Sequence, residues 1–232
     1  LLPPLALIAA PVALTLVQPD LGTAILLAAG GGVVMWLAGV SAWYFTAAGA
    51  GAGGLVWAVL ASRGTDWQIL ADYQYRRIEV FLDPSLDPLG AGYHITQSKI
   101  AFGSGGLSGR GFMQGTQSRL NFLPEKHTDF IFTTLAEEFG FFGAVGLLVL
   151  YGLIVLFCTI SALANRDRYG ALLTGGLAAA FFFFFAVNMA MVTGLAPVVG
   201  VPLPLVSYGG SAMMVLLISF GLIQSAHIHR PR

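Results

Sequence analysis

Three long stretches without a charged residue constrain the fold of this chain more than any other feature. Residues 21–62, 139–165 and 169–229 contain no Asp, Glu, Lys or Arg. A membrane-spanning helix needs about 20 apolar residues, so these stretches leave room for several spans. Because the chain is 56% hydrophobic and only 9% charged, we exclude an ordinary soluble domain. The alternating pattern of membrane strands is absent, which leaves helices.

Hydropathy, with Gly, Pro and charged residues taken as breaks, predicts an all-α polytopic membrane protein with about six transmembrane helices. We expect the spans near residues 3–17, 21–38, 43–61, 130–160, 170–192 and 208–226. The first residue is Leu, and no basic segment precedes the first apolar run, so this run is interpreted as an internal helix rather than a signal peptide. We therefore expect residues 1–232 to be a single membrane domain from a chain truncated at its N-terminus.

The distribution of charge predicts the orientation of the spans. Residues 62–138 hold sixteen of the 22 charged residues, nine acidic and seven basic. The remaining basic residues lie in two short segments, Arg166 and Arg168 after the fourth span and Arg230 and Arg232 after the sixth. Short basic loops mark the cytoplasmic side, so the C-terminus is expected inside and residues 62–129 form a large extracytoplasmic loop. The same alternation places residues 18–20 and 193–207 outside.

Two parts of the large loop have recognisable patterns. Residues 66–82 combine a rough helical stripe of apolar side chains with a proline-rich end, which predicts either an interfacial amphipathic helix or a plain connector. Residues 103–111, GSGGLSGRG, are glycine-rich and flanked by Lys99 and Arg110. This run fits either contact with a lipid phosphate or a flexible hinge. It matches neither nucleotide-binding glycine motif, so nucleotide binding is not expected.

Polar residues near the outer ends of the spans are candidates for a site. Asp20 either caps the second span or provides a carboxylate in an outward cavity. Asn188, inside the fifth span, is typical of an interhelical hydrogen bond. Residues 194–210 contain three prolines and four glycines, so they cannot form a continuous helix. Such a segment is either a structural re-entrant loop or the wall of a cavity.

The sequence NFLPEKHTDFIF, residues 121–132, crowds ionisable groups before the fourth span. Thr128 or Asp129 can simply cap that helix. Alternatively, Asp129, Thr133 and Glu137 follow i, i+4, i+8 spacing, which predicts a polar line down one side of a helix entering the bilayer. Carboxylates at membrane depth usually face a cavity or a partner. This second interpretation predicts an outer chamber with Asp129 at its mouth.

Several motifs together resemble the SEDS family (shape, elongation, division and sporulation) of membrane glycosyltransferases. The matching stretches are QPDLGTAIL, DPLGAGYHITQSKIAFGSGGLSGRG, GTQSRLNFLPEKHTDFIF, LAEEFG and GVPLPLVSYGGSA. The last stretch is more similar to the elongation branch of the family than to the division branch. The resemblance implies a ten-helix membrane fold, of which this chain holds the last six helices.

The resemblance also implies a site on the outer face. Asp129 matches the essential acid of the family and Asp20 matches a second carboxylate in the central cavity. Arg119, Glu125, Lys126 and His127 match the surrounding loop motif of the family. Further candidates for supporting or substrate-binding residues are Lys99, Arg110, Glu137 and Ser207. Asp129 is expected either to act as the general base or to hold a divalent cation, Mg²⁺ or Mn²⁺. No organic cofactor is expected.

By resemblance, the protein is a peptidoglycan glycosyltransferase. It is expected to polymerise lipid II on the outer face of the cytoplasmic (inner) membrane by an inverting transfer that releases undecaprenyl diphosphate. The implied partners are lipid II and undecaprenyl lipid, the membrane, a class B penicillin-binding protein and the elongation machinery, without nucleic acid. Two alternative functions are a flippase for lipid-linked precursors and a non-catalytic scaffold for a cell-wall synthase.

Overall fold

The fold is described from a computed structural model of the chain. The structure describes residues 1–18, 20–64, 68, 72–83, 86–87, 90–120 and 127–230; the side chains at 72–74, 77, 78, 91 and 118 are also left out of the description.

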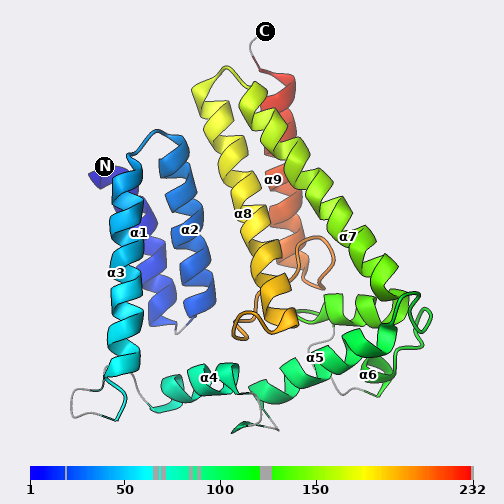
Figure 1. Ribbon diagram of the computed structural model, residues 1–232. Helices are drawn as coiled ribbons and strands as arrows, with labels where there is room; N and C mark the ends of the chain where they lie inside the picture. The colour runs from blue at the N-terminus through cyan, green and yellow to red at the C-terminus, as the bar shows by residue number, and fades with distance from the viewer. Residues whose placement is uncertain are drawn as a thin grey trace.

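In this described part of the chain, all regular structure is helical, as predicted (Figure 1). The helices are α1 (Leu2–Val17), α2 (Leu21–Leu37), α3 (Ala42–Ala61), α4 (Asp72–Leu82), α5 (Ala91–Gly105), α6 (Thr116–Arg119), α7 (Ile131–Ala164), α8 (Arg168–Thr193) and α9 (Gly210–Ile228).

Six of these helices are the apolar ones predicted from hydropathy. Four of them, α3, α7, α8 and α9, are long and apolar enough to cross a membrane. The other two, α1 and α2, are apolar but have only 16 and 17 residues. At about 1.5 Å per residue they fall short of an apolar layer about 30 Å thick. The all-helical membrane fold is therefore confirmed, and four of the six predicted spans have full membrane-crossing length in the described part of the chain.

The apolar helices alternate in direction, so the loops gather at two ends of the bundle (Figure 1). The turn between α1 and α2, the α4–α6 region and the segment between α8 and α9 all lie at one end, called here the loop end. Both chain termini and the α7–α8 turn lie at the opposite end. The three polar elements that the sequence predicted to converge on one membrane face do share one end of the bundle.

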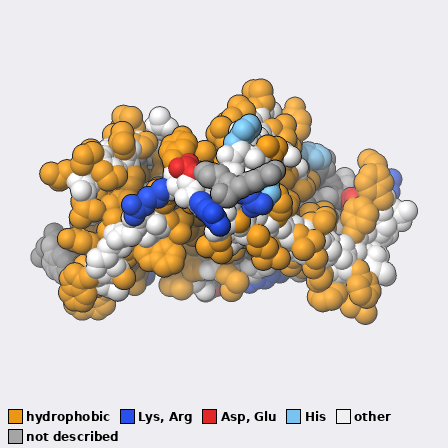
Figure 2. Space-filling view, turned by 90° about the horizontal axis from the view of Figure 1, so that it is seen from above, with side chains coloured by type: hydrophobic (Ala, Val, Ile, Leu, Met, Phe, Trp, Pro, Cys, Tyr) orange, Lys and Arg blue, Asp and Glu red, His pale blue; other side chains and the backbone are white. Residues whose placement is uncertain are grey.

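The end opposite the loop end is where the short basic segments lie. Arg166 and Arg168 flank the α7–α8 turn and Arg230 follows α9. Figure 2, viewed from this end, shows basic side chains grouped on a surface that is otherwise largely apolar. This arrangement matches the distribution on which the predicted orientation rests.

At the loop end, α4 and α5 lie across the bundle rather than along it (Figure 1). A buried hydrogen-bond cluster ties α4 to the end of α3. The Tyr75 hydroxyl lies 2.7 Å from Ser62 Oγ and donates to the carbonyl of Val59 at 2.9 Å. The predicted helix over residues 66–82 is confirmed from Asp72 onward, and residues 66, 67 and 69–71 lie outside the described residues.

A sharp bend divides α7 near its start, at Gly140. This residue has φ 67° and ψ −161°, a conformation that is essentially restricted to glycine. The glycine-rich turn after α5 wraps around the bend: Arg110 N donates to Glu137 O at 3.0 Å, and Phe141 N donates to Gly106 O at 2.9 Å. The first part of α7 consequently lies along α5 before the helix turns into the bundle (Figure 1).

These bonds exclude a phosphate cradle made by the backbone amides at residues 109–111, and the close packing excludes a free hinge. The amides of Gly109, Arg110 and Gly111 donate to the carbonyls of Gly105, Glu137 and Glu138, respectively. Because those N–H groups are already bonded, they cannot also cradle a phosphate. Nor is the run a free hinge, because a Cβ on Gly109 would lie only 2.1 Å from Glu138 O. The glycines allow the backbones of the turn and of α7 to touch.

We predict that Gly140→Ala destabilises the protein. A Cβ at this position would lie 2.2 Å from Gly109 N, and an alanine held at this φ and ψ costs about 1–3 kcal/mol. Gly146→Ala is the matched control, because Gly146 lies in the same helix and a Cβ added there would meet nothing within 4 Å. Thermal unfolding in detergent should show a lower midpoint for Gly140→Ala alone. Equal midpoints for both variants would contradict the close backbone contact between the glycine-rich turn and the bend in α7.

Candidate active site

The non-helical segment between α8 and α9 is anchored to α7 and α8 by buried polar side chains. Tyr151 of α7 donates its hydroxyl to the carbonyl of Pro204, while its ring stacks on Phe185 with centroids 4.6 Å apart. Asn188 of α8, which is fully buried, donates from Nδ2 to the carbonyl of Val201 at 2.6 Å. This segment, residues 194–209, is therefore a fixed re-entrant segment rather than a loose connection, and it is called here the wall.

Residues 127–129 are bonded through their backbone carbonyls to this wall and to Asn188 of α8. Asn188 Nδ2 also donates to the carbonyl of Asp129 at 2.8 Å. Ser207 Oγ donates to the carbonyl of Thr128 at 2.6 Å and accepts from Leu203 N at 2.7 Å. Farther along the wall, Tyr208 N donates to the carbonyl of His127 at 2.9 Å. Three consecutive carbonyls thus set the position of Asp129. Ser207, predicted as a supporting residue, acts on the backbone.

The Asp129 carboxylate and the first turn of α2, which follows Asp20, lie near neighbouring residues of the wall, Gly200 and Val199. A Cβ added to Gly200 would lie 3.6 Å from Asp129 Oδ2, so the half-buried Asp129 side chain rests against Gly200. A Cβ added to Gly22 would lie 2.9 Å from Val199 Cβ, so the first turn of α2 packs on the same peptide. Asp20, just before that turn, is therefore near the same stretch of wall.

Asp20 also performs the capping role that the sequence left open. Its Oδ1 accepts a hydrogen bond from Thr23 N at 3.0 Å. Hydrogen bonds from Thr23, through its side chain and then its backbone, lower the pKa of the Asp20 carboxyl, with a smaller contribution from the amide of Gly22. A carboxylate held in its charged form at the N-terminus of α2 is a stable negative group at the loop end.

Thr133 and Glu137 do not line an open chamber, contrary to the sequence interpretation. Thr133 Oγ1 lies 2.8 Å from Ser98 Oγ of α5. Glu137 is fully buried, and its Oε1 accepts from Thr116 Oγ1 and from Gln117 N, both at 3.0 Å. The bend at Gly140 turns this face of α7 against α5 and α6. Glu137 thus holds α6 in place, as a buried carboxylate with several donors can.

The predicted cations occupy different surroundings. Lys99 of α5 is exposed beside Gly194, where its Nζ would lie 3.3 Å from a Cβ added to that glycine. Arg110 donates from Nε to the carbonyl of Ser104 at 3.2 Å. Arg119 is exposed at the end of α6. Among the predicted cations in the described part of the chain, Lys99 is thus the one that lies next to the wall.

The remaining residues of the predicted loop motif are only partly described. His127 is exposed, and it contacts the wall through its backbone carbonyl. Glu125 and Lys126 lie outside the described residues.

Sequence reasoning missed His94, which lies beside the Asp129 segment. Its ring packs against the ring of Phe130 with centroids 5.9 Å apart and an interplanar angle of 34°. The Nδ1 atom of His94 is buried and has no hydrogen-bond partner among the described residues. A lone histidine in a helix gives no pattern of its own, so only its contact with Phe130 marks it as part of the site.

The described side chains offer one carboxylate, Asp129, to the divalent cation that the sequence predicts. Among the described residues there is no group of three or more His, Cys, Asp or Glu side chains that could hold a metal ion. Mg²⁺, however, usually keeps several waters and needs only one or two carboxylates when substrate phosphates complete its shell. Asp129 therefore fits a shared cation of this kind better than a dedicated protein metal centre.

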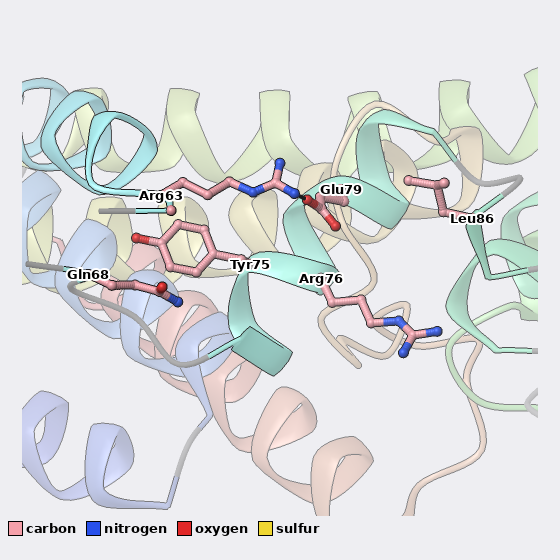
Figure 3. Close-up of a pocket in the computed structure, with 7 residues that line it drawn as sticks. Arg63, Gln68, Tyr75, Arg76, Glu79 and Leu86 are labelled. Carbon is pink, nitrogen blue, oxygen red and sulfur yellow. Dashed lines mark ion pairs between the residues drawn. The ribbon is translucent and has the colours of Figure 1, made fainter. Parts of the chain in front are cut away.

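Two cavities adjoin the loop end. The first, of about 520 Å³, is lined by Arg63, Gly64, Gln68, Tyr75, Arg76, Glu79 and Leu86. Figure 3 shows Arg63 reaching across it to form an ion pair with Glu79, while Arg76 points away from that pair. The second cavity, of about 380 Å³, lies between α8, α9 and the wall, is largely apolar, and includes Ser207 and Tyr208. An apolar cavity thus adjoins the wall that carries Asp129.

Comparison with known proteins identifies relatives over the whole chain. A family model described as "Cell cycle protein" and named for FtsW, RodA and SpoVE matches residues 1–232. The peptidoglycan glycosyltransferase MrdB of Escherichia coli (strain K12) is 51% identical over 227 residues, which cover 97% of this chain and 60% of MrdB. The peptidoglycan glycosyltransferase RodA of Treponema pallidum (strain Nichols) is 46% identical over 161 residues, 68% of this chain and 36% of RodA.

A solved structure supports the same relationship. One chain of a peptidoglycan synthase complex, described as coordinating polymerization and crosslinking, matches with a TM-score of 0.78 at 34% identity. The match covers 99% of this chain and 62% of that chain. This chain therefore spans about 60% of the length of MrdB and a similar share of the solved relative.

Proposed function

Since this chain belongs to the FtsW/RodA/SpoVE family, we propose that the protein is a peptidoglycan glycosyltransferase that polymerises lipid II during cell elongation. The observation that carries the proposal is the fixed position of Asp129. Two of the three consecutive backbone carbonyls at residues 127–129 are bonded to the re-entrant wall and the third is bonded to Asn188 of α8, and the Asp129 carboxylate lies near Gly200 at the loop end. A carboxylate whose backbone is anchored in this way is positioned before the substrate arrives.

In the proposed reaction, the 4-hydroxyl oxygen of the acceptor sugar attacks the anomeric carbon of the donor. The bond from that carbon to the diphosphate oxygen breaks on the opposite face, so the configuration inverts and undecaprenyl diphosphate leaves with the electron pair. Asp129 accepts the proton of the attacking hydroxyl as general base, a role worth about 10²–10⁴-fold in rate. We assign a supporting role to Asp20, which precedes the turn of α2 that packs on Val199.

The leaving diphosphate carries negative charge that needs a cationic partner. We assign this role to Lys99, beside the wall, together with Arg119 and the predicted Lys126. A divalent cation shared by Asp129 and the diphosphate would supply the same charge stabilisation. The apolar cavity between α8 and α9 is suited to part of the undecaprenyl chain, because it is apolar and adjoins the wall.

The proposed orientation places the loop end outside the inner membrane and the C-terminus in the cytoplasm. It rests on the basic residues at the opposite end of the bundle and on the positive-inside rule. The proposed partner is a class B penicillin-binding protein, since the matched solved structure is a complex that coordinates polymerization with crosslinking.

Asp129→Asn should reduce polymerisation of lipid II by at least about 100-fold, the lower end for loss of a general base. The amide keeps the size of the side chain and leaves the three backbone carbonyl bonds intact, so the fold should persist. The measurement is glycan-strand formation by the purified full-length protein with its transpeptidase partner. Asp167→Asn is the matched control, because Asp167 caps α8 at the opposite end of the bundle.

Near wild-type polymerisation by Asp129→Asn would exclude this residue as the base. A lipid flippase would show a translocation defect and no polymerisation even in the wild-type protein. A scaffold would show no activity change in either carboxylate variant.

Cysteine labelling should reveal the orientation of the bundle. In a background free of other cysteines, Leu120→Cys at the loop end should react with a membrane-impermeant thiol reagent in intact cells. Tyr169→Cys, at the opposite end, should react only after the cells are opened. Both native side chains are largely exposed, 62% and 73%, so accessibility within the protein does not limit labelling. Reversed labelling would refute the proposed outer location of the site.

A further inference from the structure

We propose that His94 donates a hydrogen bond from Nε2 to a substrate oxygen in the Asp129 site. The inference rests on the proposed glycosyl transfer for its substrate and on the structure for its geometry. Neither the sequence pattern nor the similarity to known relatives assigned this residue a role.

The position of His94 is fixed by two contacts one helical turn apart. Its ring packs on Phe130, the residue after Asp129. Four residues later in α5, Ser98 Oγ lies 2.8 Å from Thr133 Oγ1 and donates to the carbonyl of Val192 at 2.8 Å. Because Ser98 of α5 is bonded to both α7 and α8, α5 can neither rotate about its axis nor slide along it. His94 is therefore held at the level of the Asp129 segment.

The surroundings of the imidazole ring determine where its proton sits when the ring is neutral. Nδ1 is buried and has no partner among the described residues. A buried N–H without an acceptor is rarer in proteins than a buried acceptor without a donor. The neutral ring therefore carries its proton on Nε2.

Nε2 differs from Nδ1 in its accessibility. The His94 side chain is only partly buried, and within the described part of the chain Nε2 is neither hydrogen-bonded nor fully enclosed. This nitrogen occupies the outer edge of the ring, away from Cβ. The His94 ring therefore has an accessible N–H donor. The ring contacts Phe130, which directly follows the proposed base, Asp129. Glycosyl transfer offers it two kinds of acceptor, a diphosphate oxygen and a sugar hydroxyl oxygen.

A set of three substitutions separates hydrogen bonding from ring packing. His94→Gln places an amide N–H near the position of Nε2, His94→Asn places one near Nδ1, and His94→Phe keeps the aromatic contact with Phe130 but has no donor. We expect His94→Gln to retain at least about a third of wild-type kcat/KM for lipid II polymerisation. His94→Asn and His94→Phe should lose about 10- to 100-fold, the range for a hydrogen bond to a charged group.

His229→Phe, at the opposite end of the bundle, is the matched control and should retain wild-type activity. Thermal stabilisation of each full-length variant by undecaprenyl diphosphate alone provides a second readout that needs no turnover. Weaker stabilisation of His94→Asn and His94→Phe, but not of His94→Gln, assigns the acceptor oxygen to the diphosphate. Unchanged stabilisation with a lower kcat assigns it to the sugar hydroxyl.

The opposite order, with His94→Phe retaining more activity than His94→Gln, would show that His94 only packs on Phe130. That result would overturn the inference. Equal activity of all three variants would overturn it as well. If the wild-type protein stabilises with undecaprenyl diphosphate but does not polymerise lipid II, the proposed function fails. The ranking of the variants in stabilisation then tests the His94 donor separately, and equal stabilisation of all three would overturn it.

Discussion

The organisation of the loop end depends on satisfying the backbone of a non-helical segment among membrane-spanning helices. Without water, every unpaired N–H or C=O at this depth costs several kcal/mol. The wall between α8 and α9 meets this requirement with Tyr151 and Asn188 from neighbouring helices and with its own Ser207. Because Asn188 and Ser207 also bond the carbonyls of Asp129 and Thr128, the same groups that stabilise the wall position the candidate base.

A second constraint comes from the bend in α7. Gly140 allows the first turns of α7 to lie along α5, and the glycine-rich turn closes over the bend through backbone bonds. This arrangement buries Thr133 and Glu137 against α5 and α6. It also brings His94 onto Phe130. The contact of α5 with Phe130 and the bonds to residues 127–129 are both made between residues distant in the sequence.

The apolar helices were predictable from the sequence because continuous apolar runs between charged loops have few alternative structures in a membrane. Asp129 and Asp20 were predicted as site residues from their position and their resemblance to family motifs. Glu137 was interpreted wrongly because i, i+4, i+8 spacing assumes a helix entering the bilayer directly, whereas the bend at Gly140 lays its first turns along α5. A positive φ at one glycine leaves no trace in hydropathy, and neither does the contact of His94 with Phe130.

The attachment of the Asp129 segment to the wall is the central claim, and disulfide formation between His127→Cys and Tyr208→Cys measures it directly. Tyr208 N and His127 O are 2.9 Å apart, which brings the two Cα atoms within disulfide range, and both side chains are exposed to oxidant. In full-length protein free of other cysteines, we predict rapid cross-linking in native membranes. A control pair, His127→Cys with Tyr169→Cys at the opposite end, should not cross-link. Failure of the 127–208 pair to cross-link would contradict the account.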